Sequence, residues 1–503
     1  MKRTIRSAAA LAVLGLFLQG CGGDDDGDST PLPEERRAQD ERVYTVNEAG
    51  LRATLTTTVA AERGGNGAFL PIAGLDTDRW VGVLNNAAYQ VEVPRNWNGI
   101  LVMYAHGYRG TGANLTVAPP SIREYLIRNG YAWAASSYSK NYYDVRAGVE
   151  DTNALALAFR NIAAQNGRTL AEPSKTYITG HSMGGHVAGA AVDQEALETA
   201  VNKVRYSGAV PMCGVLGDTE LFDFFAAYQA AAQHLAGFPA TSWPVANWAQ
   251  IEPQVKARYF TAFPSGATPG ALTPDGVRLR ELVENLSGGE RPTFDVAFTL
   301  PASGGGYTDT VWGTFGRDGT VNGILNREGV DTRNFTYVLD DDPTGSQALN
   351  QNVFRVTADP EANRLRRDGL RWIPKTNARI SVPVVTIHTL GDGYVPWSMQ
   401  QIYRRRADAN GTSNFLVQRA IRGVSHCDFT LQEQEEAFEA MTVWEQTGRR
   451  PLGDQILDPA LTATPTYGCR FSRTPEARDS AGVRGLRPLA PACPAGSAAP
   501  NFG

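Results

Sequence analysis

The motif Gly-His-Ser-Met-Gly at residues 180–184 constrains the fold of this chain more than any other feature of its sequence. A stretch typical of a strand precedes it, and a stretch typical of a helix follows it. Glycines two residues before and two after a serine leave room for a sharp strand-to-helix turn. Such a turn exposes Ser182 above free N–H groups that favour developing negative charge. The motif predicts a nucleophilic Ser182, with the N–H of Met183 as an oxyanion donor; a purely structural turn is the alternative.

Strands and helices alternate along two parts of the chain, residues 43–213 and 381–450. Strands are expected at 43–60, 88–93, 99–105, 131–137, 176–179, 205–210, 382–388 and 415–420, and helices at 120–129, 145–165, 183–200, 396–407 and 430–446. Strands linked through helices form right-handed crossovers. The pattern predicts a mainly parallel, doubly wound sheet with helices on both faces.

The acid and the base that Ser182 needs are expected further along the chain. Asp392 lies in Leu-Gly-Asp-Gly-Tyr-Val-Pro, just after the strand at 382–388, and His426 follows the next strand in Gly-Val-Ser-His-Cys. Both occupy loops beyond the carboxyl ends of strands, where a triad acid and base belong. His426 is therefore the predicted general base and Asp392 the residue that orients its ring. Asp218 is the alternative acid.

The chain has only six histidines, so the other five can be considered one by one. Each has a role that is more ordinary than catalysis, because of where it lies. His388 is expected inside a buried strand, His186 packs on the helix after the serine, His181 positions the turn, His234 lies in the intervening segment, and His106 belongs to another motif.

That other motif, His106-Gly107-Tyr108, ends the strand at 99–105. A glycine there lets the backbone approach the nucleophile closely. The backbone N–H of Tyr108 is the predicted second oxyanion donor. An ordinary turn explains Gly107 equally well when the motif is taken by itself.

The sequence resembles the α/β-hydrolase superfamily over roughly residues 80–213 and 381–450. The resemblance is carried by four motifs in order: Ala-His-Gly-Tyr-Arg-Gly at 105–110, Gly-His-Ser-Met-Gly-Gly-His at 180–186, Thr-Leu-Gly-Asp-Gly-Tyr-Val-Pro at 389–396, and Gly-Val-Ser-His-Cys-Asp-Phe at 423–429. It implies an α/β-hydrolase fold and serine esterase activity.

Cys427, directly after the predicted base, is similar to a cysteine of feruloyl esterases and tannases. In those enzymes it forms a disulfide with a cysteine directly before the nucleophile. Here His181 occupies that position, so Cys213, at the end of the strand after the serine helix, is the expected partner. Two buried free thiols are the alternative.

Residues 214–380 exceed a minimal hydrolase core and are expected to form an inserted cap, because structureless loops of this length are rare. Trp243, Trp248, Tyr259 and Phe260 line either a pocket for a bulky or aromatic ester or the core of the cap itself. Carboxylates that would recognise a peptide amino terminus are available at Glu252, Glu281, Glu284 and residues 340–342.

The tail at 451–503 is rich in Pro, Gly and Arg and carries Cys469 and Cys493, which offer a second disulfide. Four cysteines, the two of the tail with Cys213 and Cys427, allow three pairings, and the sequence does not choose among them.

The amino terminus resembles a bacterial lipoprotein signal. Residues 1–20 contain three early cations and a short apolar run, and they end in Leu18-Gln19-Gly20-Cys21. The resemblance implies an acylated Cys21, a flexible tether at 21–42 and a lipid-anchored location in the bacterial cell envelope, on the periplasmic or outer surface. Ordinary secretion and a transmembrane anchor are the alternatives, although the run is shorter than the roughly 20 residues that span a bilayer.

Charge and cysteine spacing exclude several function classes. Lys and Arg number 47 against 52 Asp and Glu, so the chain lacks the basic footprint of a nucleic-acid-binding protein. Its five cysteines contain no CxxC pair, and no metal or other cofactor is expected. The sequence thus predicts a serine hydrolase that cleaves small or polymer-derived carboxylic esters. A serine peptidase of the aminopeptidase type, an acyltransferase with the same triad and a non-catalytic lipoprotein are the alternatives.

Overall fold

The computed structural model describes residues 42–57, 65–243, 245, 247–265, 268–301, 307, 330–360 and 362–503. The predicted signal at 1–20, Cys21 and nearly all of the tether lie outside these residues. Within them, no helix combines the length and the apolar character that a bilayer crossing requires.

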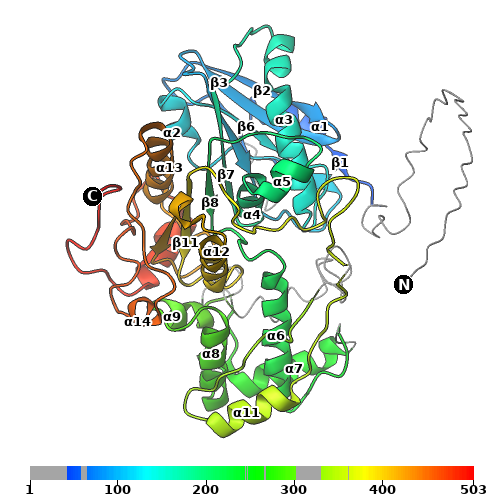
Figure 1. Cartoon of the computed structure of the whole chain (residues 1–503), viewed down its shortest axis with the longest axis vertical. Helices are drawn as coiled ribbons and strands as arrows, with labels where there is room; N and C mark the ends of the chain where they lie inside the picture. The colour runs from blue at the N-terminus through cyan, green and yellow to red at the C-terminus, as the bar shows by residue number, and fades with distance from the viewer. Residues whose placement is uncertain are drawn as a thin grey trace, which may run out of the picture. The chain divides into compact units, whose positions relative to one another are not determined.

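An eight-stranded sheet organises the fold (Figure 1). Its strands lie in the spatial order β2-β3-β6-β4-β7-β8-β11-β12. All neighbours from β6 to β12 are parallel, whereas β3 is antiparallel to β6 and to β2. The strands are β2 (Thr77–Leu84), β3 (Ala87–Pro94), β4 (Ile100–Ala105), β6 (Ala132–Ser136), β7 (Lys175–His181), β8 (Gly208–Met212), β11 (Val384–Thr389) and β12 (Leu416–Ile421). The mainly parallel sheet predicted from the sequence is confirmed.

Helices cover both faces of the sheet, because successive strand residues point to opposite sides. Leu101 and Met103 of β4 pack in one apolar cluster and Val102 in the other. The first cluster contains side chains of α3 (Val145–Gln165), α4 (Met183–Ala191) and α12 (Ser398–Ala409), and the second those of α2 (Arg123–Arg128) and α13 (Leu431–Thr447). This arrangement brings the carboxyl ends of the parallel strands, and the loops that follow them, to one edge.

The strand expected at 43–60 is wrong. Among residues 43–57, which the structure describes, only β1 (Thr45–Val46) is a strand, paired with β5 (Asn114–Leu115), and it is followed by α1 (Glu48–Ala53). The Asn47 side chain accepts a hydrogen bond from the N–H of Gly50 and so caps this helix, while Leu51 is buried beneath it. A capping side chain and one apolar contact therefore outweigh the alternating pattern. Strand β2, in contrast, was not predicted.

The single helix expected at 183–200 is divided into α4 and α5 (Gln194–Thr199). Asp193 separates them, because its extended backbone ends the first helix and its carboxylate accepts the N–H of Glu195 at the start of the second. The same carboxylate accepts the N–H of Arg379 at 3.2 Å. Asp193 is buried, and burial raises its pKa to about 7.

The Asp193 pKa predicts a pH dependence of stability. Between about pH 4 and pH 7 the folded protein holds a proton that the unfolded chain has released, so this group's contribution to stability falls as pH rises. In Asp193→Asn the titration is absent. We expect the Tm of the variant, relative to wild type, to rise by roughly 2–4 °C from pH 5 to pH 8 in thermal unfolding followed by circular dichroism. A Tm difference independent of pH would contradict the assignment.

The segment between β8 and β11, which is predicted to be a cap and keeps that name below, contains an apolar cluster of its own, formed mainly by its helices. These are α6 (Glu220–Leu235), α7 (Trp248–Tyr259), α8 (Pro274–Leu286), α9 (Phe294–Thr299) and α11 (Pro343–Asn352), with a short hairpin of β9 (Phe260–Ala262) and β10 (Ala271–Leu272). Figure 1 shows α6, α7, α8 and α11 gathered together. Trp248, Tyr259 and Phe260 are buried in this core and Trp243 is buried in the first sheet cluster, so the described structure places them as packing residues.

Residues after α11 return to the sheet domain. Leu370 and Ile373 join the first sheet cluster, and Arg371 forms an ion pair with Glu195 of α5 at 2.6 Å. The chain then enters β11.

The tail packs against β12 and α13 and contains α14 (Pro459–Thr462), α15 (Ala481–Leu486) and a 3-10 turn (Arg487–Leu489); a further 3-10 turn (Ser413–Phe415) precedes β12. A disulfide joins Cys469 and Cys493. The segment predicted as a stapled tail thus contains regular structure and packs against the sheet.

Candidate active site

Ser182 stands at the turn from β7 into α4. Its backbone has φ 58° and ψ −122°, which is strained for a residue other than glycine. A Cβ at Gly180 would lie 2.2 Å from the carbonyl oxygen of Gly184, and one at Gly184 would lie 2.0 Å from that of Ala105. The two flanking positions therefore require glycine, as the motif predicts.

The first turn of α4 supplies N–H groups beneath Ser182. Met183 is the first helical residue, so its N–H is one of the donors that have no acceptor within the helix. The N–H of Ser182 itself donates to the carbonyl of Met212 at 3.0 Å and is not available. This leaves the N–H of Met183 as the elbow donor closest in sequence to the serine hydroxyl.

Asp392 and His426 lie in contact. The imidazole Nδ1–H of His426 donates to the Asp392 carboxylate, with distances of 2.9 Å to Oδ1 and 2.7 Å to Oδ2. Asp392 is fully buried, and its Oδ1 also accepts the N–H groups of Tyr394 and Val395. These donors fix the carboxylate and, through it, the tautomer of the His426 ring.

The loops that carry these two residues are joined to each other through their backbones. Gly391 N–H donates to the carbonyl of Gly423 at 2.9 Å, and the Thr389 hydroxyl donates to the carbonyl of Ser425 at 2.7 Å. The relative position of acid and base is therefore set by their own loops.

The Nε2 atom of His426 lies 3.4 Å from Cys427 Sγ, and no hydrogen bond joins it to Ser182 Oγ among the described residues. His426 is nevertheless held near the elbow, because the adjacent Cys427 is bonded to Cys213, which follows β8, the strand paired with β7. Catalytic hydrogen bonds are often long without substrate and shorten when it binds.

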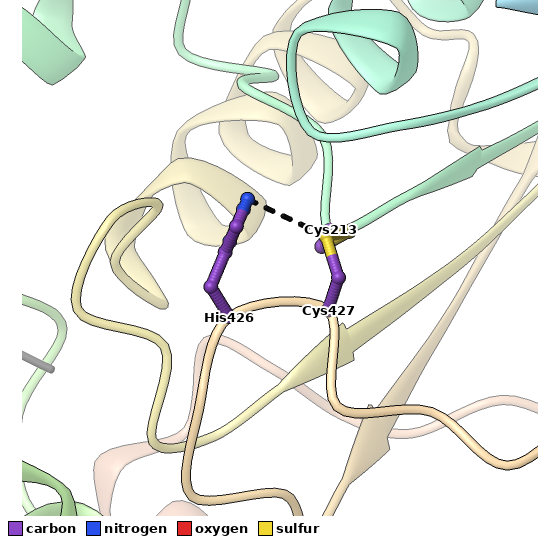
Figure 2. Close-up of side chains that lie close together, drawn as sticks. All are labelled: Cys213, His426 and Cys427. Carbon is purple, nitrogen blue, oxygen red and sulfur yellow. Dashed lines mark hydrogen bonds between the residues drawn. A yellow bond between two sulfur atoms is a disulfide. The ribbon is translucent and has the colours of Figure 1, made fainter. Parts of the chain in front are cut away.

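A disulfide between Cys213 and Cys427 lies beside the His426 ring (Figure 2). It connects the residue after β8 to the turn of the base, with a Cα–Cα distance of 5.3 Å. The two sulfurs and the imidazole are close enough to suggest a metal site. Both thiols are consumed by the disulfide, so this cluster offers only one nitrogen ligand and does not fit a metal ion.

The remaining histidines are engaged elsewhere. Burial lowers the pKa of His181 to about 4, and its Nε2–H donates to Gln434 Oε1 at 3.0 Å. His186 Nε2–H donates to the Pro374 carbonyl, and His388 Nε2–H donates to that of Val395. His234 is on α6 of the cap, and the Nδ1–H of His106 donates to the Gly107 carbonyl.

Asp218, the alternative acid, serves another purpose. Its carboxylate accepts from Arg406 at 2.6 Å and from the N–H of Thr376 at 3.2 Å. Burial disfavours its ionised form, but Arg406 and Lys375 hold its pKa below the usual value. Asp218 thus ties the start of the cap to α12.

Gly107 approaches the nucleophile closely. A Cβ at this position would lie 3.1 Å from Ser182 Cβ and 3.3 Å from the carbonyl oxygen of His181. The loop after β4 therefore borders the space above Ser182, where the predicted donor Tyr108 follows directly. Tyr108 is 37% exposed.

This proximity predicts the effect of Gly107→Ala. The added methyl group must push the loop away from Ser182, which displaces the oxyanion donor. We expect kcat to fall by up to about 10-fold, because the methyl group displaces its neighbours by a few tenths of an ångström, and a misplacement of about 1 Å costs about 100-fold. Gly112→Ala is the control, since nothing lies within 4 Å of its added Cβ. Equal kcat values for the two variants in a p-nitrophenyl ester assay would contradict the prediction.

Carboxylates of the cap that might bind a peptide amino terminus are largely engaged. Glu252 pairs with Lys256 at 2.7 Å. Asp342 caps α11 and pairs with Arg278 at 2.6 Å, and Asp340 accepts from Asn285. Glu284 accepts the N–H of Arg291 at 3.3 Å, and burial raises its pKa to about 7.

Two residues that lie outside the sequence motifs also contact the site, and the sequence does not predict them. Gln434 on α13 receives the His181 hydrogen bond and also one from Ser121. Arg291 of the cap is buried and donates to the carbonyl of Leu390, two residues before Asp392, at 2.7 Å. No local pattern marks either residue, because each acts across a large separation in sequence.

Comparisons with known proteins found distant similarities. No family model matches the chain. A curated protein, o-phthalyl amidase of Xanthobacter agilis, is 22% identical over 417 residues, covering 73% of this chain and 87% of that protein. Feruloyl esterase B from Aspergillus oryzae aligns over 77% of this chain and 86% of its own, with 15% identity and a TM-score of 0.38. Another esterase from Aspergillus oryzae aligns over 79% and 84%, with 13% identity and a TM-score of 0.41.

The order and direction of the strands in the sheet identify the fold. Numbered along the chain, its eight strands lie in the order 1-2-4-3-5-6-7-8, with the second antiparallel to its neighbours. The nucleophile turn follows the fifth strand, and the His-Gly loop follows the third. These are the positions that the nucleophile elbow and the oxyanion loop occupy in α/β-hydrolases. The chain has the α/β-hydrolase fold.

Proposed function

We propose that this protein is a serine hydrolase that cleaves carboxylic esters through an acyl-enzyme, with Ser182, His426 and Asp392 as its triad. The observation that carries the proposal is the 2.7 Å contact between His426 Nδ1 and the buried Asp392, on the loops that follow β11 and β12, at the same edge of the sheet as the Ser182 turn. A buried carboxylate on Nδ1 leaves Nε2 as the proton acceptor.

The reaction then follows from the positions of these groups. Ser182 Oγ attacks the ester carbonyl carbon while His426 Nε2 takes its proton. The N–H groups of Met183 and Tyr108 stabilise the tetrahedral oxyanion. Collapse of the intermediate breaks the bond to the alcohol, which leaves with the proton from His426. Water enters, gives its proton to His426 and releases the acid by the same route.

Bulky or aromatic esters are the proposed substrates. The Tyr394 ring lies edge-on to His426 with centroids 5.5 Å apart, and Tyr108 exposes its ring in the loop beside the nucleophile. Aromatic side chains beside the reacting atoms favour substrates that offer apolar or aromatic surface. The sources of such esters include small molecules and fragments of polymers.

A substrate panel tests the proposal. Purified protein and Ser182→Ala would be compared on p-nitrophenyl esters of short and long acyl chains, on hydroxycinnamoyl esters and on aminoacyl nitroanilides. Ester turnover that is lost in Ser182→Ala is the expected result, with aromatic acyl groups giving the highest kcat/KM. A wild-type protein that neither hydrolyses an ester nor reacts with a fluorophosphonate would overturn the proposal.

Amide cleavage is a second candidate, favoured by one observation: the curated relative at 22% identity is named an amidase. The same triad attacks an amide, with His426 protonating the departing amine. Nitroanilide turnover that exceeds ester turnover in the panel would make this the main activity.

We also propose that the mature protein is anchored through a lipid on Cys21 in the cell envelope. The support is the sequence Leu18-Gln19-Gly20-Cys21 after a basic and apolar segment. Expression with labelled palmitate should mark the wild-type protein and leave Cys21→Ser unlabelled. A label on both would place the lipid elsewhere.

A further inference from the structure

The turn that carries His426 is closed by a side chain of its own. Asp428 Oδ2 accepts the N–H of Val424 at 3.3 Å, so this hydrogen bond spans the three residues 425–427, with His426 in the middle. Asp428 and Ser425 are buried, and Cys427 within the turn has φ 54°, in the left-handed region. The position of the imidazole therefore depends on the position of the Asp428 carboxylate.

The side chain of Arg487, which lies in the tail, contacts this turn. Arg487 is 8% exposed, and its Nε lies 3.7 Å from Asp428 Oδ2. One terminal nitrogen of Arg487 also donates to the Asp428 backbone carbonyl. The same guanidinium donates to both carboxylate oxygens of Glu433, at 2.7 and 3.1 Å. Arg487 thus joins the histidine turn to the first turn of α13.

Glu433 is itself fixed, so Arg487 is anchored on a rigid support. Its Oε2 accepts the N–H of Thr430 in the capping box of α13, and its Oε1 accepts the N–H of Arg473 at 2.7 Å. Asp479 of the tail accepts the N–H of Leu431 at the same helix end. A planar, bidentate donor held in this way restrains a turn more tightly than one flexible contact does.

We propose that Arg487 is a positioning residue for catalysis, which holds the 424–428 turn so that His426 stays in register with Asp392 and Ser182. The inference rests on the proposed function, because it assigns the tail a task only if His426 is the base. The segment 451–503 is then part of the catalytic apparatus, although none of its residues touches the reacting atoms.

Two conservative variants test the proposal. Arg487→Lys keeps the charge but removes the bidentate geometry, and Asp428→Asn keeps the shape of the turn but removes its charge. Arg484→Lys is the matched control, since Arg484 lies one helical turn earlier and is exposed. The readouts are the rate of fluorophosphonate labelling of Ser182, kcat and KM on the best ester, and Tm.

Labelling rate and kcat are expected to fall about 10- to 100-fold in Arg487→Lys and Asp428→Asn, with KM within twofold, because a displaced imidazole weakens chemistry more than binding. Arg484→Lys should match wild type.

A purely structural role gives a different result. If both variants lose Tm but label and turn over at the wild-type rate well below the unfolding midpoint, the proposal is wrong. This outcome is distinct from failure of the proposed function, in which wild-type protein itself is not labelled.

Discussion

Asp392→Asn is expected to lower kcat by about four orders of magnitude while leaving KM nearly unchanged. The asparagine amide would present an N–H group toward His426 Nδ1, which now donates to the carboxylate at 2.7 Å. The ring would then carry its proton on Nε2, the atom that must accept the proton of Ser182. Steady-state kinetics on the best ester, with the fluorophosphonate labelling rate as a second measure, check this expectation.

Asp218→Asn is the control that separates the two candidate acids. Asp218 pairs with Arg406, and loss of that buried pair is expected to cost about 3 kcal/mol of unfolding free energy. The kcat of the folded variant should stay within about threefold of wild type, because Asp218 contacts none of the triad. A small effect in Asp392→Asn with a large effect in Asp218→Asn would reverse the assignment.

Removal of the Cys213–Cys427 disulfide in Cys213→Ser/Cys427→Ser is expected to have the second largest effect. The bond closes a loop of 214 residues, for which chain entropy predicts a stabilisation of up to about 5 kcal/mol. It also fixes the turn next to His426, so kcat should fall about 10- to 100-fold in protein that remains folded. Urea unfolding and ester kinetics measure the two effects separately.

Cys469→Ser/Cys493→Ser provides the comparison for that variant. This bond spans only 24 residues and lies in the tail, so the same relation predicts about 3 kcal/mol. The kcat of Cys469→Ser/Cys493→Ser should fall less than that of Cys213→Ser/Cys427→Ser. Equal losses of kcat in the two double variants would mean that the disulfide beside His426 has no special effect on the base.

Features with a local cause could be predicted from the sequence. The helix at 145–165 is present with those bounds as α3, because its apolar residues recur on one face and Asp144 caps its start. The strand expected at 99–105 is β4, since a short apolar run between turn residues suits a buried strand. The Ser182 turn follows from its glycines alone. The roles of the three triad residues remain predictions.

Features with a distant cause could not be predicted. The division between α4 and α5 depends on Asp193, which also accepts the N–H of Arg379 far along the chain. The tail shows little periodicity, and its order comes from contacts such as those of Arg422, which donates to the carbonyls of Pro465 and Pro491. Nothing within a short window of sequence reveals such partners.

The insertion point of the cap has an evolutionary consequence. The cap leaves the sheet after β8 and returns before β11, and these two strands are direct neighbours, with Ala209 paired to Val384. Because the entry and exit points lie side by side, the inserted segment can lengthen, shorten or be exchanged without changing strand order. Descendants of such a chain can acquire new specificities by remodelling one continuous gene segment while inheriting the chemistry intact.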